Sequence, residues 1–242
     1  MTGISFDPAF FLTEISVAFS YLPVVAVLSI IPLFLGLISG TGLALVNIYR
    51  VKYAQSLARG YVVVMRSIPV LLQMFIVYYG MQAVYGSFGW DKTRINKFLI
   101  VLIVFTLEAA GFLSEGIRAA LTSVDSSQYE ASHSVGMTRF HTMRYVVIPQ
   151  CFPVAIPVIG SSFIGIIKGS STAYIMGIIE MIQGTSMKTA GNYKYLEAYC
   201  AVAVIYWGLT ILIEQITRFA ERKAVQYMKG GFEKSDYNRK FA

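Results

Sequence analysis

One feature of the sequence limits the possible folds more than any other: no charged residue lies between Glu14 and Arg50. A bilayer core is crossed by about 20 predominantly apolar residues in a helix, so this stretch holds a full span, expected at residues 21–46. Over the whole chain 56% of the 242 residues are hydrophobic and 14% are charged, whereas about a quarter of a typical soluble domain is charged. This composition excludes a disordered chain and argues against an ordinary soluble globule.

Further apolar segments complete a set of about five transmembrane helices. The other four are expected at residues 70–85, 98–118, 151–168 and 198–216. The fourth of the set is short and begins with Pro153 and Pro157, which membrane helices tolerate when neighbours satisfy the freed backbone groups. Gly36 and Gly40, four residues apart in the first span, are interpreted as a packing face. The predicted fold is an all-α integral membrane protein in which residues 1–242 form a single domain.

The distribution of basic residues predicts which side of the membrane each loop faces. Fourteen of the 20 lysines and arginines fall in residues 50–66, in residues 118–150 and in a basic tail at residues 218–242, against six elsewhere. Because cytoplasmic loops carry an excess of Lys and Arg, these three segments are expected in the cytoplasm. With an odd number of spans, the amino terminus then lies outside and the carboxyl terminus inside. The membrane-flanking segments explain the net charge of +7 without a nucleic-acid partner.

Sequence motifs for catalysis and for nucleotide binding are missing. The chain has no GxxxxGK[ST] phosphate-binding loop, no HExxH zinc motif and no GxSxG nucleophile turn. Both histidines, His133 and His141, fall outside the expected spans, and Glu130 with His133 is only a pair of potential metal ligands. We therefore expect no catalytic residues, no metal site and no cofactor bound by this chain.

The connection at residues 121–150 is too long for a simple turn. Small polar residues followed by Glu130 are typical of a helix start, and the pattern predicts two short helices, at residues 129–135 and 138–147, hinged at Gly136. Pro149 marks the return to the membrane. A compact helix pair of this kind fits a groove on a soluble partner. A surface hairpin that only joins two spans explains the same residues equally well.

The spacing within this connection resembles a known pattern. Residues 130–136 (EASHSVG), nine further residues and residues 146–149 (VVIP) are similar to EAA-x3-G-x9-I-x-L-P, the EAA loop of bacterial ABC-importer permeases. Ser132, Val146 and Ile148 depart from that pattern, each by a small or conservative change.

Other segments resemble one branch of that family, the polar amino acid permeases of the histidine, glutamine and arginine type. Residues 66–73 (RSIPVLLQ) are similar to its R-G-T-P-L-L-V-Q, residues 111–118 (GFLSEGIR) to its A-Y-x-x-E-x-x-R, and residues 148–150 (IPQ) to its L-P-Q. Residues 168–171 (KGSS) resemble its K-D-T-S, with Gly169 in place of the aspartate. These motifs occur in the family's order over residues 60–180, about half of the chain.

The resemblance implies the fold and mechanism of a type I ABC importer. In such importers two permease subunits line a substrate path, two separate ATPase subunits bind ATP and Mg, and an extracytoplasmic binding protein delivers the solute. The EAA helix docks in a cleft of the ATPase. Carried over to this sequence, the ATPase-coupling residues are Glu130, Ala131, Ser132 and Gly136. Met137 and Phe140, which are apolar and lie close to them, are added as coupling residues that could fill an apolar pocket of the partner. The implied permease pairs with itself or with a similar second chain in the bacterial cytoplasmic membrane.

Two glutamates expected at membrane depth, Glu108 and Glu115, are seven residues apart and so share nearly the same helix face. Arg118 is expected to pair with Glu115. Because buried carboxylates are costly, they point to a function. Glu108 is interpreted either as a contact for the cationic group of a substrate or as a partner in a pair within the protein, and the resemblance implies a structural or gating role for Glu115. The substrate-pathway candidates are Glu108, Lys168, Ser170 and Ser171, and the structural or gating candidates are Glu115, Arg118, Pro69 and Pro149. A snorkelling lysine and helix-capping serines explain the last three pathway candidates equally well.

Together these features predict the permease subunit of an ATP-driven importer for a polar amino acid, with basic amino acids and cystine as candidate solutes. The alternative is an ATP-independent secondary amino acid transporter, in which changes at Glu130 and Gly136 would leave transport intact. A membrane-embedded enzyme is a third reading, for which the sequence offers no pair of nucleophile and base.

Overall fold

Helices account for nearly all of the fold. The computed structural model describes residues 6–240, with side chains to residue 228, and this part of the chain contains no strand. The helices are α1 (Pro8–Ser20), α2 (Leu22–Ile48), α3 (Ala54–Ser67), α4 (Val70–Ser87), α5 (Lys97–Thr122), α6 (Ser126–Ser134), α7 (Arg139–Thr142), α8 (Ile148–Gly169), α9 (Met181–Thr189) and α10 (Tyr195–Lys240). Turns of 3-10 helix lie at Lys92–Arg94 and Ser170–Met176, and a π turn at Met143–Val147.

The expected set of membrane spans is present. Four helical stretches are long and apolar enough to cross a membrane: α2, α5, the rod at Arg139–Met176 that contains α8, and α10. Helices α3 and α4 qualify together as a fifth span, but they bend by 111° between Ser67 and Val70. The all-α membrane fold is therefore confirmed, and the second span is a broken one.

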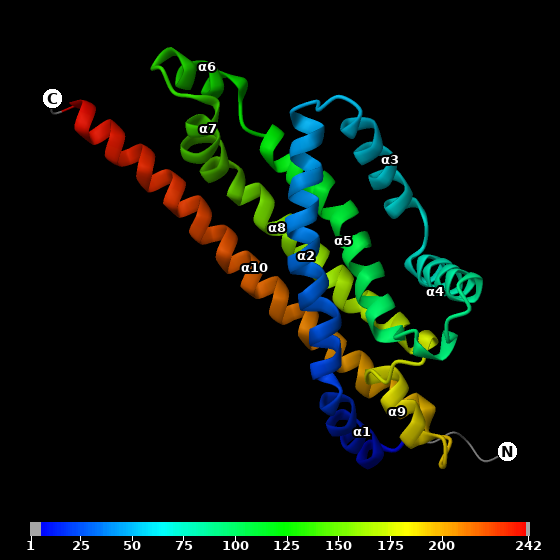
Figure 1. Cartoon of the computed structure of the whole chain (residues 1–242). Helices are drawn as coiled ribbons and strands as arrows, with labels where there is room; N and C mark the ends of the chain where they lie inside the picture. The colour runs from blue at the N-terminus through cyan, green and yellow to red at the C-terminus, as the bar shows by residue number, and fades with distance from the viewer. Residues whose placement is uncertain (1–5, 241–242) are drawn as a thin grey trace.

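The long helices α2, α5, α8 and α10 run along the length of the molecule, and α3 and α4 lie along one side next to α5 (Figure 1). Helices α6 and α7 lie at the end where α2 and α5 finish, and α1 and α9 lie at the opposite end. The basic segment expected at residues 218–242 forms the last part of the 46-residue helix α10 as far as Lys240, and residues 241–242 lie outside the described part. At about 1.5 Å per residue α10 is roughly 70 Å long, well beyond the thickness of a bilayer core.

The fourth span differs from its sequence prediction. The helix expected at residues 138–147 is not separate, because α7 continues through the π turn directly into α8. Pro149 lies in the first turn of α8, where its missing N–H and its ring disturb the carbonyl four residues earlier. A π turn accommodates this, since the Ile148 N–H donates to Met143 O, five residues back. Helix α8 then includes Pro153 and Pro157 and is longer than predicted.

Helices α2 and α5 form the central pair of the bundle, and glycines set how closely they approach. A Cβ atom added at Gly36 would lie 2.6 Å from Ala109 Cβ, and one added at Gly40 would lie 2.9 Å from Ala110 O. Only glycine fits at such positions, so the two backbones are in direct contact. Buried side chains of α2, α4 and α5, including Leu28, continue this core.

Candidate functional site

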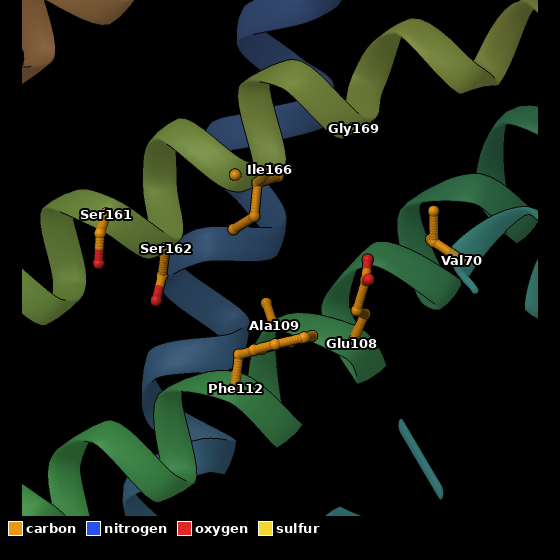
Figure 2. A pocket seen from close by; sticks show the side chains of 9 residues that line it. Val70, Glu108, Ala109, Phe112, Ser161, Ser162, Ile166 and Gly169 are labelled. Carbon is orange, nitrogen blue, oxygen red and sulfur yellow. The ribbon is translucent and has the colours of Figure 1, made fainter. Parts of the chain in front are cut away.

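A cavity of about 320 Å³ lies between α5, α8 and the first residue of α4, and it contains the pathway candidate Glu108. Figure 2 shows the side chains of α5 facing those of α8 across this space, with Val70 to one side. The walls include Glu108, Ala109 and Phe112 on α5 and Ser161, Ser162 and Ile166 on α8, together with the α8 glycines Gly165 and Gly169. We call this space the solute cavity, after the substrate-pathway role that the sequence analysis predicts for Glu108.

Among the described residues, Glu108 is the only charged side chain in the wall of the solute cavity. Its carboxylate forms no ion pair with any side chain in the described part of the protein. Ser161 Oγ donates to Val158 O at 2.9 Å, which leaves the hydroxyl oxygen free to accept a hydrogen bond. A half-buried carboxylate with acceptor oxygens opposite it favours a cationic group, such as an ammonium, in this space.

The other three pathway candidates do not join Glu108. Lys168 and Ser171 line a different hollow, between α8, α9 and α10, whose wall also contains Tyr206. Ser170 is fully buried and donates to Ile167 O at 2.7 Å, and Ser171 donates to Lys168 O at 2.7 Å. Both serines therefore bond to their own helix end, as the capping interpretation expects, and a pathway role for these residues stays a prediction.

Sequence reasoning missed most of the wall opposite Glu108. A signal for it exists: Ser161, Gly165 and Gly169 are small and recur every fourth residue, so they lie on one face of α8. The sequence analysis includes Phe112 only as part of the motif at residues 111–118. Its place in the cavity wall follows from its position one turn after Glu108 on α5.

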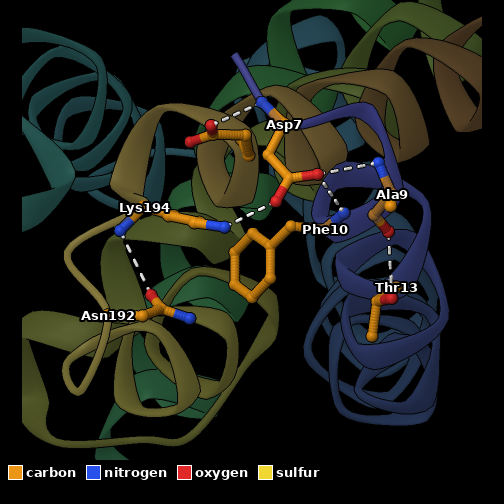
Figure 3. A network of polar contacts seen from close by, with 7 residues as sticks. Asp7, Ala9, Phe10, Thr13, Asn192 and Lys194 are labelled. Atoms are coloured by element: carbon orange, nitrogen blue, oxygen red, sulfur yellow. Dashed lines mark hydrogen bonds and ion pairs between the residues drawn. The ribbon is translucent and has the colours of Figure 1, made fainter. Parts of the chain in front are cut away.

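A polar network at the opposite end from α6 joins α1 to α10 (Figure 3). Lys194 Nζ lies 2.5 Å from Asp7 Oδ2, and the Asp7 backbone N–H donates to Glu197 at 2.9 Å. The same aspartate caps α1 through the N–H groups of Ala9 and Phe10. The hydrogen bond from Lys194, with those from the helix N-terminus, holds the pKa of Asp7 below its ordinary value. Sequence analysis predicted neither α1 nor this network, whose role is structural.

The predicted contact between Glu115 and Arg118 is present. Arg118 Nη2 and Nε lie 2.5 and 3.0 Å from the two carboxylate oxygens of Glu115, a two-pronged arrangement that fixes both side chains. The Arg66 guanidinium lies nearby, 5.5 Å from the ring centre of Phe112, which also lines the solute cavity.

The bend between α3 and α4 is stabilised by a side chain of the motif at residues 66–73, that of Gln73, to which the sequence analysis assigns no role. Pro69 has no N–H to offer to Met65 O, the carbonyl four residues earlier. The N–H of Leu72 donates to Pro69 O instead of Ile68 O. Gln73 Nε2 donates to both abandoned carbonyls, Met65 O at 3.0 Å and Ile68 O at 2.8 Å. Pro69 therefore breaks the helix and Gln73 stabilises the break.

The predicted coupling residues surround a sharp turn between α6 and α7. Gly136 has φ of +80°, a left-handed conformation that favours glycine, so the predicted hinge is confirmed. Glu130, Ala131 and Phe140 are exposed and Met137 is half-buried. Ser132 instead faces inward, where its Oγ donates to Gln128 O at 2.6 Å.

The loop is anchored to the ends of the spans. Gln150 Nε2 on α8 donates to Gln128 Oε1 on α6 at 3.1 Å, and Tyr129 packs on a buried cluster that includes Leu121 and Val147. Asp125 caps α6 through the Ser127 N–H at 2.8 Å. The exposed part of the loop is thus presented on a rigid base. His133 Nδ1 lies 3.1 Å from Met137 O, and the described residues include no cluster of three potential metal ligands.

The matched family agrees with this arrangement. The model of the family described as "Binding-protein-dependent transport system inner membrane component" matches residues 33–226, which include the solute cavity and the α6–α7 loop. The chain belongs to this family. Because it has four or five apolar helices long enough to span, this inner membrane component is a multi-pass protein of the cytoplasmic membrane.

Curated relatives and solved structures extend the same result. This inner membrane component is 34% identical over 216 residues to the probable amino-acid permease protein YxeN of Bacillus subtilis, covering 89% of this chain and 95% of YxeN. It is 33% identical to the L-cystine transport system permease protein TcyL of Bacillus subtilis, covering 84% and 85% of the two chains. Its fold matches a crystal structure of an amino acid ABC transporter with histidines at a TM-score of 0.80 and 27% identity, covering 91% of this chain and 100% of the other.

Proposed function

We propose that this chain is the permease subunit of an ATP-binding-cassette importer for a polar amino acid, coupled to a separate ATPase through the α6–α7 loop. The observation that carries the proposal is the family match, which runs through both the solute cavity and the exposed loop. Relatives named as amino-acid permeases, each covered over most of its length, support the solute class.

In this proposal the solute passes through the cavity between α5 and α8. Every free amino acid carries an ammonium group, and the Glu108 carboxylate is suited to meet it. The hydroxyls of Ser161 and Ser162 across the cavity accept further hydrogen bonds. The name of TcyL supports cystine as one candidate solute, and basic amino acids are another.

Coupling is assigned to the exposed part of the loop. Glu130 presents a carboxylate to a basic residue of the partner, while Phe140, 68% exposed, fills an apolar pocket. Gly136 allows the backbone to approach closely. ATP and Mg bind to the partner ATPase, a binding protein delivers the solute from outside, and a second permease copy or a similar chain completes the path. The loop and the end of α10 face the cytoplasm, and the amino terminus faces outward.

The decisive experiment compares two charge reversals at opposite ends of the molecule. Tagged chain is purified from its native membranes in mild detergent with the proteins bound to it, which are identified by mass spectrometry. The complex is then tested in proteoliposomes for ATP-dependent uptake of labelled arginine, histidine, glutamine and cystine. Glu130→Lys should lose the ATPase and the uptake. Asp91→Lys, an equally exposed reversal in the α4–α5 connection, should keep the ATPase.

Uptake that needs no ATP and survives Glu130→Lys would reject the proposal in favour of a secondary transporter. Co-purification of the ATPase with transport of none of the tested amino acids would keep the coupling role and reject the solute class.

A further inference from the structure

A second cavity, of about 590 Å³, lies where α2 and α5 end, and its lining is strongly basic. In the described part of the protein its lining contains a single carboxylate, that of Glu115, and four arginines, Arg50, Arg59, Arg66 and Arg118. Glu115 already pairs with Arg118. No other ion pair in the described part of the protein involves the remaining three arginines. This basic cavity therefore has an excess of positive charge that the described side chains leave uncompensated.

Arg66 is positioned without being neutralised, and Arg50 and Arg59 lie in the same cavity wall. Arg66 lies over the Phe112 ring, a contact that positions the guanidinium but supplies no negative charge. Arg59, seven residues earlier on α3, lies on the same face as Arg66. Arg50 follows the end of α2 in a tight turn, with φ of +50°. Three converging guanidinium groups repel one another, so an anion between them lowers the energy of this arrangement.

An unpartnered polar atom lies in the same wall. Asn47 Oδ1, in the last turn of α2, is buried and has no hydrogen-bond partner among the residues that the structure describes. A buried amide without a partner is costly. Because rotating the amide by 180° exchanges its oxygen and nitrogen, Asn47 can present an N–H donor to a bound anion.

The depth of the basic cavity indicates what kind of anion reaches it. Arg50 is the first charged residue after the long apolar stretch, so it marks the boundary between membrane and water. On a different face of α3 from the arginines, Leu57 is 76% exposed and Val64 lies in the same stripe, and Tyr53, just before the helix, is 87% exposed. Such an apolar stripe is stable against lipid chains rather than against water. The arginines thus lie at the depth of the lipid headgroups.

We propose that the basic cavity binds the phosphate of an anionic phospholipid. A phosphodiester accepts paired hydrogen bonds from the flat guanidinium groups, and basic pockets between membrane helices recognise anionic headgroups in this way. A zwitterionic lipid brings its own positive charge into the cavity and binds more weakly. The site is separate from the solute cavity and does not depend on which solute is transported.

The test uses the full chain in detergent and measures bound lipid by native mass spectrometry. Phosphatidylglycerol is compared with phosphatidylcholine of the same acyl chains and with soluble glycerol 3-phosphate. The double variant Arg50→Gln, Arg59→Gln should bind phosphatidylglycerol about 30-fold more weakly than the wild type. Arg139→Gln, an exposed arginine on α7 at the same end of the molecule, is the matched control and should bind as the wild type does.

Each result has a defined meaning. Glycerol 3-phosphate that binds as tightly as the lipid, and is lost in the double variant, supports the phosphate site and makes a free anion its ligand. Unchanged phosphatidylglycerol binding in the double variant, an equal loss in Arg139→Gln, or equal binding of phosphatidylcholine overturns the proposal. Arg59→Lys, which keeps the charge and disturbs packing least, should retain the preference for phosphatidylglycerol, and its loss in that variant also counts against the site.

Discussion

Replacing Gln73 with leucine should loosen the bend between α3 and α4. The side chain is buried, and its amide nitrogen is the donor to Met65 O and Ile68 O. Leucine fills a similar volume but has no hydrogen-bond donor, so both carbonyls lose their partner. The N–H that would normally bond to Met65 O is missing because residue 69 is a proline. A lost hydrogen bond costs about 1 kcal/mol, and about 1–3 kcal/mol where the remaining group stays buried. The two together predict a destabilisation of about 2–4 kcal/mol.

The assay is thermal unfolding of the purified chain in detergent, followed by tryptophan fluorescence. At about 2–4 °C per kcal/mol for a chain of this size, Gln73→Leu should lower Tm by roughly 5–15 °C. Gln82→Leu is the matched control, since it makes the same change on the same helix at a side chain that forms no hydrogen bond with any described residue. Hydrogen exchange should become faster at residues 64–73 in the first variant alone. Equal Tm values for the two variants would refute the role given to Gln73.

Three further predictions concern other parts of the molecule. Gly36→Ala should lower Tm, because overpacking of this kind costs about 1–3 kcal/mol, whereas Gly42→Ala, where a Cβ meets nothing within 4 Å, should not; equal Tm values would show that α2 and α5 are not in close contact. Glu108→Gln should raise the apparent KM for solute by about tenfold or more with unchanged expression, as expected for a lost charged hydrogen bond, and a fall in folded yield alone would make this residue structural. The lowered pKa of Asp7 stabilises the fold at pH values above the ordinary pKa of an aspartate, and this contribution is lost as the pH falls through the lower folded value. Unfolding measured below about pH 4 should therefore depend less on pH in Asp7→Asn, and an unchanged pH dependence would contradict the contact with Lys194.

Local patterns in the sequence were enough to predict the spans, the glycine packing face and the hinge. The long uncharged stretch, the four-residue spacing of Gly36 and Gly40 and the position of Gly136 each depend on near neighbours in the chain. Local composition and backbone geometry are determined by residues close together in the sequence, so these predictions needed no knowledge of the tertiary fold.

The solute cavity was harder to predict because its two walls are about 50 residues apart in the sequence. Glu108 and Ser161 face each other because of how α5 and α8 are each rotated about their own axes. The packing of the helices determines these rotations, and the spacing of residues in the sequence does not reveal them. Pro149 illustrates a different difficulty. A proline is read as a break, yet the wider π turn before it lets α7 and α8 continue as one rod.

The direct contact of α2 with α5 determines which wall of the solute cavity is free to move. At Gly36 and Gly40 no layer of side chains separates the two backbones. The two helices therefore cannot slide or rotate past each other without a steric clash, and they move as one rigid body. Glu108 lies on α5 and so belongs to this rigid pair of helices. Ser161 and Ser162 belong to α8. Three prolines of this helix, at four-residue intervals, remove backbone hydrogen bonds along one of its sides and so weaken it there. A change in the width of the cavity is therefore expected to come from flexing of the α8 wall against a stationary α5, while the hydrogen bonds from Gln73 keep the bend at Pro69 fixed.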